Sequence, residues 1–320
     1  EMVERLADPL LAGVYGGEAE KLSARAVLPR LVEMEARYGS LSRALLRAKS
    51  ESGRTGSAPP PPLFTSLRNG MQQLVEAVTA RLDPAGLCLG QGVRRVARQG
   101  NHWLVSVERG QPARFDGVIL ALPAYAAAEL LEESAAALPA KLREILYSSS
   151  ITVTLGYDAA AAHRSGFRLP PGFGCLVPRS EGRRMLACTF VHQKFPHRAP
   201  PGRWLLRAFL GGSADESALQ LDDQEIQNLV CRELKDLLGL GPAPDFVRIF
   251  RWPRSMAQYE VGHLKRVAEI ERLRALLPGL YLAGNAYGGV GVPDCVRSGR
   301  AAARAAATGA GSFSFPSELP

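Results

Sequence analysis

The C-terminal part of the chain contains the run GLYLAGNAYGGVGVPDCVRSGRAAA, which spans residues 279–303. Its first residues, Leu280 to Ala283, form a short apolar stretch that predicts a buried strand. Gly284 and the later glycines predict a bend with close backbone approach, because glycine has no Cβ to collide. A helix is predicted from about Asp294, a residue type that often serves as an N-cap. This succession of strand, glycine loop and helix is typical of a layered α/β fold.

The residues of this loop leave two interpretations open. Backbone N–H groups at a helix N-terminus can hold an anion or the polar edge of a cofactor. The alternative is a plain glycine-rich turn followed by a capped, alanine-rich helix. A P-loop is excluded, because the run does not contain the pattern GxxxxGK[ST].

The N-terminal part of the chain is predicted to be helical and then irregular. Apolar residues recur at helical spacing within residues 1–50. Residues 50–62 are rich in Ser, Gly and Pro and end in four prolines, which disfavours regular structure. Residues 63–82 then predict a short strand, a glycine turn and an amphipathic helix.

The rest of the chain alternates strand and helix patterns. The nearly continuous apolar run in 115–123 predicts a strand that is buried on both faces. Residues 246–259 predict a strand that runs into a loop. Further strands are predicted in 87–99, 102–108, 151–157, 172–178, 184–191 and 203–212. Helices are predicted in 124–146, after Leu264, and from Asp222 or Asp223 to an end at Gly239 and Gly241.

These strands fall into two sets, one near 65–122 with 280–284 and the other near 151–212. We therefore expect a mixed α/β (α+β) fold with two sheets and two domains, between which the chain passes more than once. The predicted boundaries place a helical part and linker in 1–62, the first domain in 63–123 and 250–310, the second domain in 124–249, and a tail in 311–320.

Composition excludes several classes of protein. The net charge is +8, but the basic residues are dispersed, which argues against nucleic-acid binding and for a solvated surface. Attraction to an anionic membrane or to a polycarboxylate substrate is the alternative. Five cysteines without a CxxC pair argue against a disulfide framework or a zinc site and for a reducing compartment. No apolar run approaches the length of a membrane span. The acidic start, EMVERLADPL, resembles neither a signal nor a transit peptide, and we expect the chain to be a fragment.

Several segments resemble one protein family. The pattern L-x-G-N-A-Y-x-G-V-G-x-x-D-C-x-x-S-G closely resembles the C-terminal FAD motif of the protoporphyrinogen oxidase and coproporphyrinogen III oxidase family, within the flavin amine-oxidase superfamily. RWPRSMAQYEVGHLKRVAEIE resembles the segment just upstream, LFTSLRNGMQQLVEAV a second FAD-domain stretch, and PGFGCLVP a substrate-domain loop. The resemblance covers nearly the whole chain and implies an FAD-linked two-domain reductase fold with an incomplete Rossmann-like FAD domain and a substrate domain.

The resemblance also assigns site residues. Trp252 offers a flat apolar wall to a ring system, and a Phe, a bare backbone and an aliphatic side chain can enclose a flat macrocycle. Ordinary core packing is the alternative for Trp252 and for each Phe. The implied flavin contacts are Val93, Trp252, Gly284, Asn285, Val290, Gly291 and Val292, and the implied substrate contacts are Phe173, Gly174, Leu176 and Phe209.

The implied reaction is oxidation of a porphyrinogen, either protoporphyrinogen IX or coproporphyrinogen III, in haem biosynthesis, with FAD as cofactor and O2 as acceptor. Because the cofactor carries the chemistry, no catalytic side chain and no metal ligand is expected. The five histidines, His263 among them, are interpreted as surface or loop residues.

One departure from the family pattern is large. The dinucleotide fingerprint GxGxxG, expected well upstream of LADPLLAGVYGG, is not in the sequence. Two alternatives follow: another flavin amine-oxidase-like enzyme that acts on amines or carotenoid precursors, or a non-catalytic domain that binds a partner or a lipid surface. The resemblance further suggests a cytoplasmic protein, peripheral contact with the inner face of the membrane, and ferrochelatase or a second copy of the chain as partners.

Overall fold

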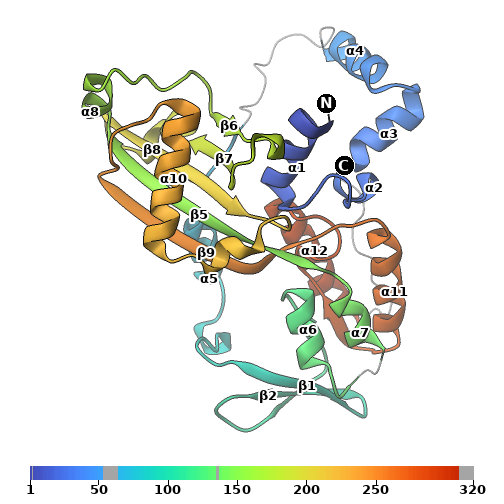
Figure 1. The fold of residues 1–320 in the computed structure, drawn as a ribbon. Coiled ribbons are helices and arrows are strands. Elements are labelled where there is room, and N and C mark those ends of the chain that lie inside the picture. The colour runs from blue at the N-terminus through green and yellow to red at the C-terminus, as the bar shows by residue number, and fades with distance from the viewer. Residues whose placement is uncertain (2, 53–63, 135–136, 310–320) are drawn as a thin grey trace.

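The computed structural model describes residues 1, 3–52, 64–134 and 137–309 (Figure 1). The chain forms a mixed α/β structure, as predicted. The N-terminal part is helical, again as predicted: a short π-helix, Val3–Ala7, precedes α1 (Asp8–Tyr15), α2 (Ala24–Val27), α3 (Pro29–Tyr38) and α4 (Leu41–Ser52).

The segment that follows residue 63 differs from its prediction. Residues 64–71 form no strand, and the chain enters helix α5 (Gln72–Thr79) from an irregular segment. The reason is a set of side-chain contacts distant in sequence. The Arg198 guanidinium donates to the Ser66 hydroxyl and the Leu67 carbonyl, and the Phe64 ring packs edge-on against Phe173. These contacts hold the segment without a strand partner.

Three short strands form an antiparallel sheet in the order β1-β2-β3: β1 (Val93–Gln99), β2 (His102–Val107) and β3 (Ala113–Phe115). The strand predicted over 87–99 begins only at Val93. A short 3-10 helix, Pro84–Gly86, precedes it, and Gly90 adopts a positive φ of 71° in the intervening turn. A turn of this kind interrupts extended backbone, which explains the late start.

The strand β4 (Val118–Leu120) pairs in parallel with β10 (Leu280–Leu282), which is the buried strand predicted from the C-terminal run. The prediction that 115–123 is one strand buried on both faces is wrong. Phe115 belongs to β3, and Ile119 is 39% exposed. Within the described residues the β4–β10 sheet has only two strands, so the other edge of β4 has no strand partner there.

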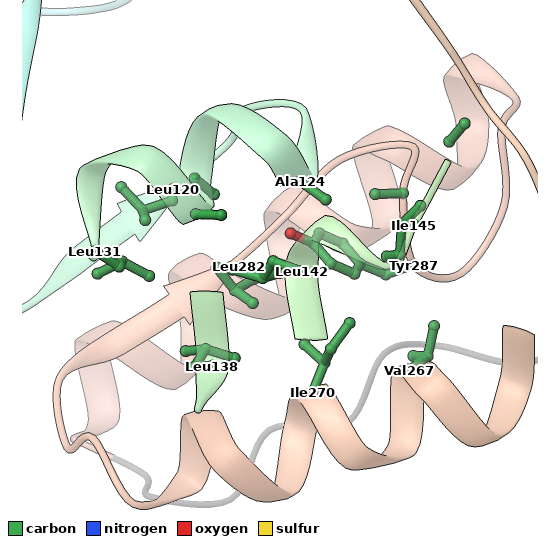
Figure 2. Close-up of a cluster of buried hydrophobic side chains, with 14 of the residues drawn as sticks. Leu120, Ala124, Leu131, Leu138, Leu142, Ile145, Val267, Ile270, Leu282 and Tyr287 are labelled. Carbon is green, nitrogen blue, oxygen red and sulfur yellow. The ribbon is translucent and has the colours of Figure 1, made fainter. Parts of the chain in front are cut away.

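The helices α6 (Ala124–Leu130), α7 (Leu138–Arg143) and α11 (His263–Ala275) pack around this parallel pair. Figure 2 shows their side chains converging with Leu120, Leu282 and Tyr287 into one apolar cluster. Ile270 of α11 and Leu142 of α7 are both fully buried there.

The larger sheet has five antiparallel strands in the order β6-β7-β8-β5-β9. Its strands are β5 (Tyr147–Asp158), β6 (Gly174–Leu176), β7 (Met185–Phe190), β8 (Arg203–Gly211) and β9 (Phe246–Ala257), and the helices α8 (Ala159–Arg164) and α9 (Val191–Lys194) lie between them, together with three 3-10 segments, Arg179–Glu181, Pro196–Arg198 and Glu216–Gln220. The predicted strands in 151–157, 172–178, 184–191 and 203–212 are confirmed. In 246–259 the strand continues to Ala257 rather than ending in a loop, because it pairs with β5 on both sides of a bulge at 253–255.

One face of this sheet is covered by α10 (Asp223–Leu238), which crosses it in Figure 1. Asp222 caps the helix: its carboxylate accepts from the Glu225 N–H at 2.8 Å, and Glu225 accepts in return from the Asp222 N–H. The helix ends at Gly239, which has a φ of 80°. Ile226, Val230 and Leu234 of α10 are fully buried against the sheet. The predicted start and end of this helix are confirmed.

The predicted domain boundaries stay a prediction. The described residues form two large apolar cores, one around the β4–β10 pair and one between α10 and the five-stranded sheet, and a small third cluster of Tyr281, Ala283, Ala302 and Ala305. Strand β9 runs through position 250, the expected start of the C-terminal FAD-domain segment, without a break.

Truncation of Ile270 tests the first core. We expect Ile270→Ala to lower the free energy of unfolding by about 2–5 kcal/mol, because it removes a fully buried side chain and leaves a cavity. Leu264→Ala in the same helix, where the side chain is half-exposed, is the control and should cost well under half as much. Urea denaturation measures both, and equal losses would contradict the packing of α11 described above.

Candidate functional site

The glycine loop after β10 is held at its two ends by one hydroxyl group. The Tyr259 hydroxyl donates to the Asn285 carbonyl oxygen and accepts from the Gly289 N–H, both at 2.8 Å. The Tyr259 side chain is almost fully buried, and burial raises the pKa of its hydroxyl. The group therefore stays protonated and serves as donor and acceptor at the same time. Gly284 is fixed separately, because its N–H donates to the Ser298 hydroxyl at 3.3 Å.

The helix that follows is α12 (Val292–Thr308), and its cap differs from the prediction. Gly291, not Asp294, is the N-cap residue. Asp294 lies in the first turn, where its carboxylate accepts from the Gly291 N–H at 3.0 Å and pairs with Arg297. A Cβ on Gly289 would lie 2.4 Å from the Asp294 carboxyl carbon, so the carboxylate occupies the space that this glycine leaves open. The helix begins at Val292, earlier than predicted, because Pro293 at its second position is well suited to the first turn of a helix.

His263 lies beside Tyr259, and its predicted surface position is wrong. The imidazole is fully buried and stacks on the Tyr259 ring with the ring centres 3.9 Å apart. Burial of the imidazole lowers the pKa of His263 to about 4. The imidazole is therefore neutral at pH 7 and supports the ring that ties the glycine loop.

Gln258, the residue before Tyr259, connects this region to the N-terminal helices and to the five-stranded sheet. Its side-chain amide donates to the Tyr15 carbonyl at 2.8 Å and to the Ser148 hydroxyl at 2.9 Å. No role was predicted for Gln258 or Tyr259. The signal that could have found them is the M-x-Q-Y-x-x-G-H run, in which Gln258, Tyr259 and His263 all fall.

Trp252 and Phe209, predicted from separate segments, lie together. Both line a cavity of about 340 Å³, to which Ala12, Gly13 and Gly16 of the N-terminal helix region also contribute. Trp252 is 49% exposed, and its indole N–H donates to the Thr152 hydroxyl at 3.2 Å. A tryptophan in the core would be covered by other side chains, so its half-exposed ring favours a contact surface over core packing.

The other predicted substrate residues lie on and beside β6. Phe173 and Leu176 are half-exposed, and Leu176 shares a row across the sheet with Ala187 and Phe209. Gly174 has a backbone reason to be glycine. It adopts a φ of 149°, and a Cβ there would lie 2.1 Å from the Cys188 carbonyl oxygen of the neighbouring strand. Strand pairing accounts for this glycine without a ligand.

The remaining residues that were predicted to contact the flavin lie in two separate places. Val290, Gly291 and Val292 lie together at the N-terminus of α12: Val290 packs partly on the first core, and Val292 is half-exposed. Val93 lies instead at the start of β1, in the separate three-stranded sheet, and is 40% exposed. The described contacts do not join it to the cavity or to the glycine loop.

These residues fit a flavin in two respects. The N-terminus of a 17-residue helix, with exposed backbone at Gly288, suits the partial negative charge on the polar edge of the ring system. Trp252 supplies a flat apolar surface. Residues 1–307 match the family model described as "Flavin containing amine oxidoreductase".

The chain belongs to the flavin containing amine oxidoreductase family.

Members of this family with related sequences include two porphyrinogen oxidases. The chain is 34% identical over 312 residues to coproporphyrinogen III oxidase of Bacillus subtilis (strain 168), which covers 96% of this chain and 65% of the relative. It is 29% identical over 314 residues to the chloroplastic protoporphyrinogen oxidase of Nicotiana tabacum, covering 92% and 57%. The chain thus spans 65% and 57% of the length of these two relatives, less than two thirds in both cases.

Solved structures agree with this placement. A crystal structure named "Putative protoporphyrinogen oxidase from Exiguobacterium sp. 255-15" superposes with a TM-score of 0.78 at 30% identity, covering 93% of this chain and 62% of that one. Cyclohexylamine oxidase from Brevibacterium oxydans IH-35A gives a TM-score of 0.65 at 16% identity, covering 96% and 64%, a likeness of fold alone.

Removal of the Tyr259 hydroxyl tests how the glycine loop is held. Tyr259→Phe leaves the Asn285 carbonyl and the Gly289 N–H without their partner, so we expect a loss of about 1–3 kcal/mol in unfolding free energy. Amide hydrogen exchange within 285–291 should accelerate. Tyr15→Phe, which removes a single bond to the Val27 carbonyl, is the control and should leave exchange in the loop unchanged. Unchanged exchange in Tyr259→Phe would show that the loop is fixed by other contacts.

The buried His263 predicts an acid-sensitive stability. Its folded pKa, about 4, lies below the unfolded value of 6.5, so the unfolded chain binds the additional proton between these two pH values. Stability is therefore complete above about pH 6.5 and falls as the pH drops toward 4, by about 3 kcal/mol for this group. Between pH 7 and pH 4 the free energy of unfolding of the wild type should therefore fall by about 3 kcal/mol more than that of His263→Gln. Parallel pH profiles of the two proteins would contradict a buried neutral imidazole.

Proposed function

We propose that this chain carries the substrate face and the C-terminal flavin-facing loop of an FAD-dependent porphyrinogen oxidase that uses O2 as acceptor. The observation that carries the proposal is the cavity that brings Trp252 and Phe209 together on one sheet face. The relatives named above, coproporphyrinogen III oxidase and protoporphyrinogen oxidase, point to the substrate class. A flat, largely apolar macrocycle matches an apolar cavity with aromatic walls.

The residues of the chain act by placement. Trp252, held by its bond to Thr152, offers a fixed plane for a ring to lie against. The loop after β10, fixed by Tyr259, would hold the flavin through Val290 to Val292. The aliphatic and aromatic walls of the cavity would exclude water from the reacting carbon. The bound flavin would supply the acceptor for a hydride from a meso carbon and would be reoxidised by O2.

From the family resemblance we also propose that the protein contacts ferrochelatase, a second copy of the chain, or the inner face of a membrane. Leu6, Leu10, Leu45 and Leu46 of the N-terminal helices are more than half exposed, which supports the membrane contact. In the part of the chain that the structure describes, each helix is too short or too polar to cross a membrane.

The experiment uses the full-length protein that contains this chain. We expect the purified protein to carry flavin absorbance bands, and anaerobic coproporphyrinogen III or protoporphyrinogen IX to bleach them, with porphyrin fluorescence appearing on admission of O2. Cyclohexylamine and putrescine should leave the bands unchanged. Bleaching by an amine alone would favour the amine-oxidase alternative, and a protein without flavin would favour the non-catalytic one.

Trp252→Ala tests the role of the indole. The variant should bind flavin or porphyrin on the order of tenfold more weakly, which corresponds to ~1.4 kcal/mol, because a flat contact surface is lost. Phe115→Ala, which removes an equally exposed aromatic from the separate three-stranded sheet, should bind both as the wild type does. Titration of flavin fluorescence and porphyrin fluorescence measures the two constants. Wild-type affinities in Trp252→Ala would remove Trp252 from the site.

A further inference from the structure

The outer face of the five-stranded sheet, the face opposite α10, carries two adjacent rows of different chemistry. The first row, which we call the aromatic row, consists of Leu176, Ala187, Phe209, Thr152 and Phe250, which pair across five neighbouring strands. Phe250 is 52% exposed, and its ring centre lies 6.3 Å from that of Trp252. Two members of this row, Thr152 and Phe209, also line the cavity that contains Trp252, so the row extends from the cavity across the sheet.

The second row, which we call the arginine row, lies two residues further along each strand. Thr154 of β5 pairs with Arg207 of β8 on one side and with Arg248 of β9 on the other. Strand side chains alternate between faces, so both arginines project from the same face as Phe209 and Phe250. Strand spacing places the two arginine Cα atoms about 10 Å apart, and the two rows about 7 Å apart.

Neither arginine of this row contacts a carboxylate among the residues that the structure describes. Arg248 donates only to the Val247 carbonyl at 3.1 Å, and both side chains are exposed. Other arginines of the same sheet are paired: Arg203 with Asp158 and Asp245, and Arg251, on the opposite face of β9, with Asp223. Arg254 of β9 also has no carboxylate partner among the described residues, but its guanidinium group lies over the Tyr125 ring, 3.6 Å from the ring centre. Arg207 and Arg248 are thus exposed arginines of this sheet that have neither a carboxylate nor an aromatic partner in the part of the chain that the structure describes.

We propose that Arg207 and Arg248 bind carboxylates of the porphyrinogen whose macrocycle lies over the aromatic row. The inference rests on the proposed function and extends it by naming the residues that recognise the charged edge of the substrate. A guanidinium group binds a carboxylate with two parallel hydrogen bonds, so two of them fit a pair of propionates on one edge of a ring. The apolar row contacts the uncharged body of the same ligand.

The experiment compares a charged and an uncharged probe on the flavin-loaded, full-length protein. Coproporphyrin III carries free carboxylates, and its tetramethyl ester carries none. Arg207→Gln and Arg248→Gln should each weaken coproporphyrin III binding about tenfold, measured by porphyrin fluorescence, and leave binding of the ester unchanged. KM for coproporphyrinogen III should rise by a similar factor with little change in kcat. Arg207→Lys should recover part of the affinity, since it keeps the charge but loses the bidentate geometry.

The matched control is Arg232→Gln, which removes one exposed positive charge from α10, on the other side of the same sheet. It should bind both probes as the wild type does, and added salt should weaken only the binding that depends on Arg207 and Arg248.

Three results would overturn the inference. In the first, the double variant with both Arg207→Gln and Arg248→Gln binds coproporphyrin III as the wild type does and keeps its oxidase activity. This result would refute carboxylate binding by the arginine row while the proposed function stands. Equal losses for the acid and the ester, or a fall in melting temperature without a change in binding, would show that these residues pack against another segment. A wild-type protein that neither binds porphyrin nor oxidises the porphyrinogen would refute the proposed function and this inference together.

Discussion

Everything on the candidate substrate face depends on the alternation of side chains along β5, the central strand of the larger sheet. Ile151, Val153 and Leu155 are fully buried under α10, which leaves Thr152 and Thr154 on the opposite face. A shift of one residue in pairing would exchange these two sets and expose the core, so the hydrophobic pattern fixes the register strongly. The same register brings Phe209 and Phe250 to either side of Thr152, and Arg207 and Arg248 to either side of Thr154.

The cavity and the glycine loop belong to different parts of the fold, and two consecutive residues connect them. Gln258 joins the end of β9 to Tyr15 and Ser148, and Tyr259 joins it to the loop after β10. Both side chains are nearly fully buried, so loss of either leaves unsatisfied polar groups in the interior. This short segment therefore positions the glycine loop after β10 relative to the cavity wall that contains Trp252 and Phe209. The proposed transfer between a ring and a cofactor would require such a fixed relation.

Local signals predicted the elements whose cause is local. Asp222 and Gly239 bound their helix as expected, because capping depends on a few neighbouring residues. The strands around Trp252 and Phe209 were predicted from their residue patterns. Their meeting in one cavity was not predicted, because the family resemblance assigned Trp252 to the flavin and Phe209 to the substrate. Residues 64–67, the burial of His263 and the roles of Gln258 and Tyr259 were missed, because each depends on contacts with residues far away in the sequence. The contact of Arg198 with Leu67, for example, joins positions 131 apart.

The arginine row shows what single-strand patterns leave undetermined. Arg207 and Arg248 lie on strands that are separated in the chain by α10, and each alone looks like an ordinary solvent-exposed residue. Only the pairing of both strands with β5 brings them to one row, beside half-exposed aromatic side chains. Phe250 and Trp252 are half-exposed, so each gains only part of the roughly 1.5–3 kcal/mol that full burial of a large apolar side chain contributes. A ligand with an apolar body and a carboxylate edge would cover the aromatic row and neutralise the arginines at once, which matches this face better than an uncharged amine substrate would.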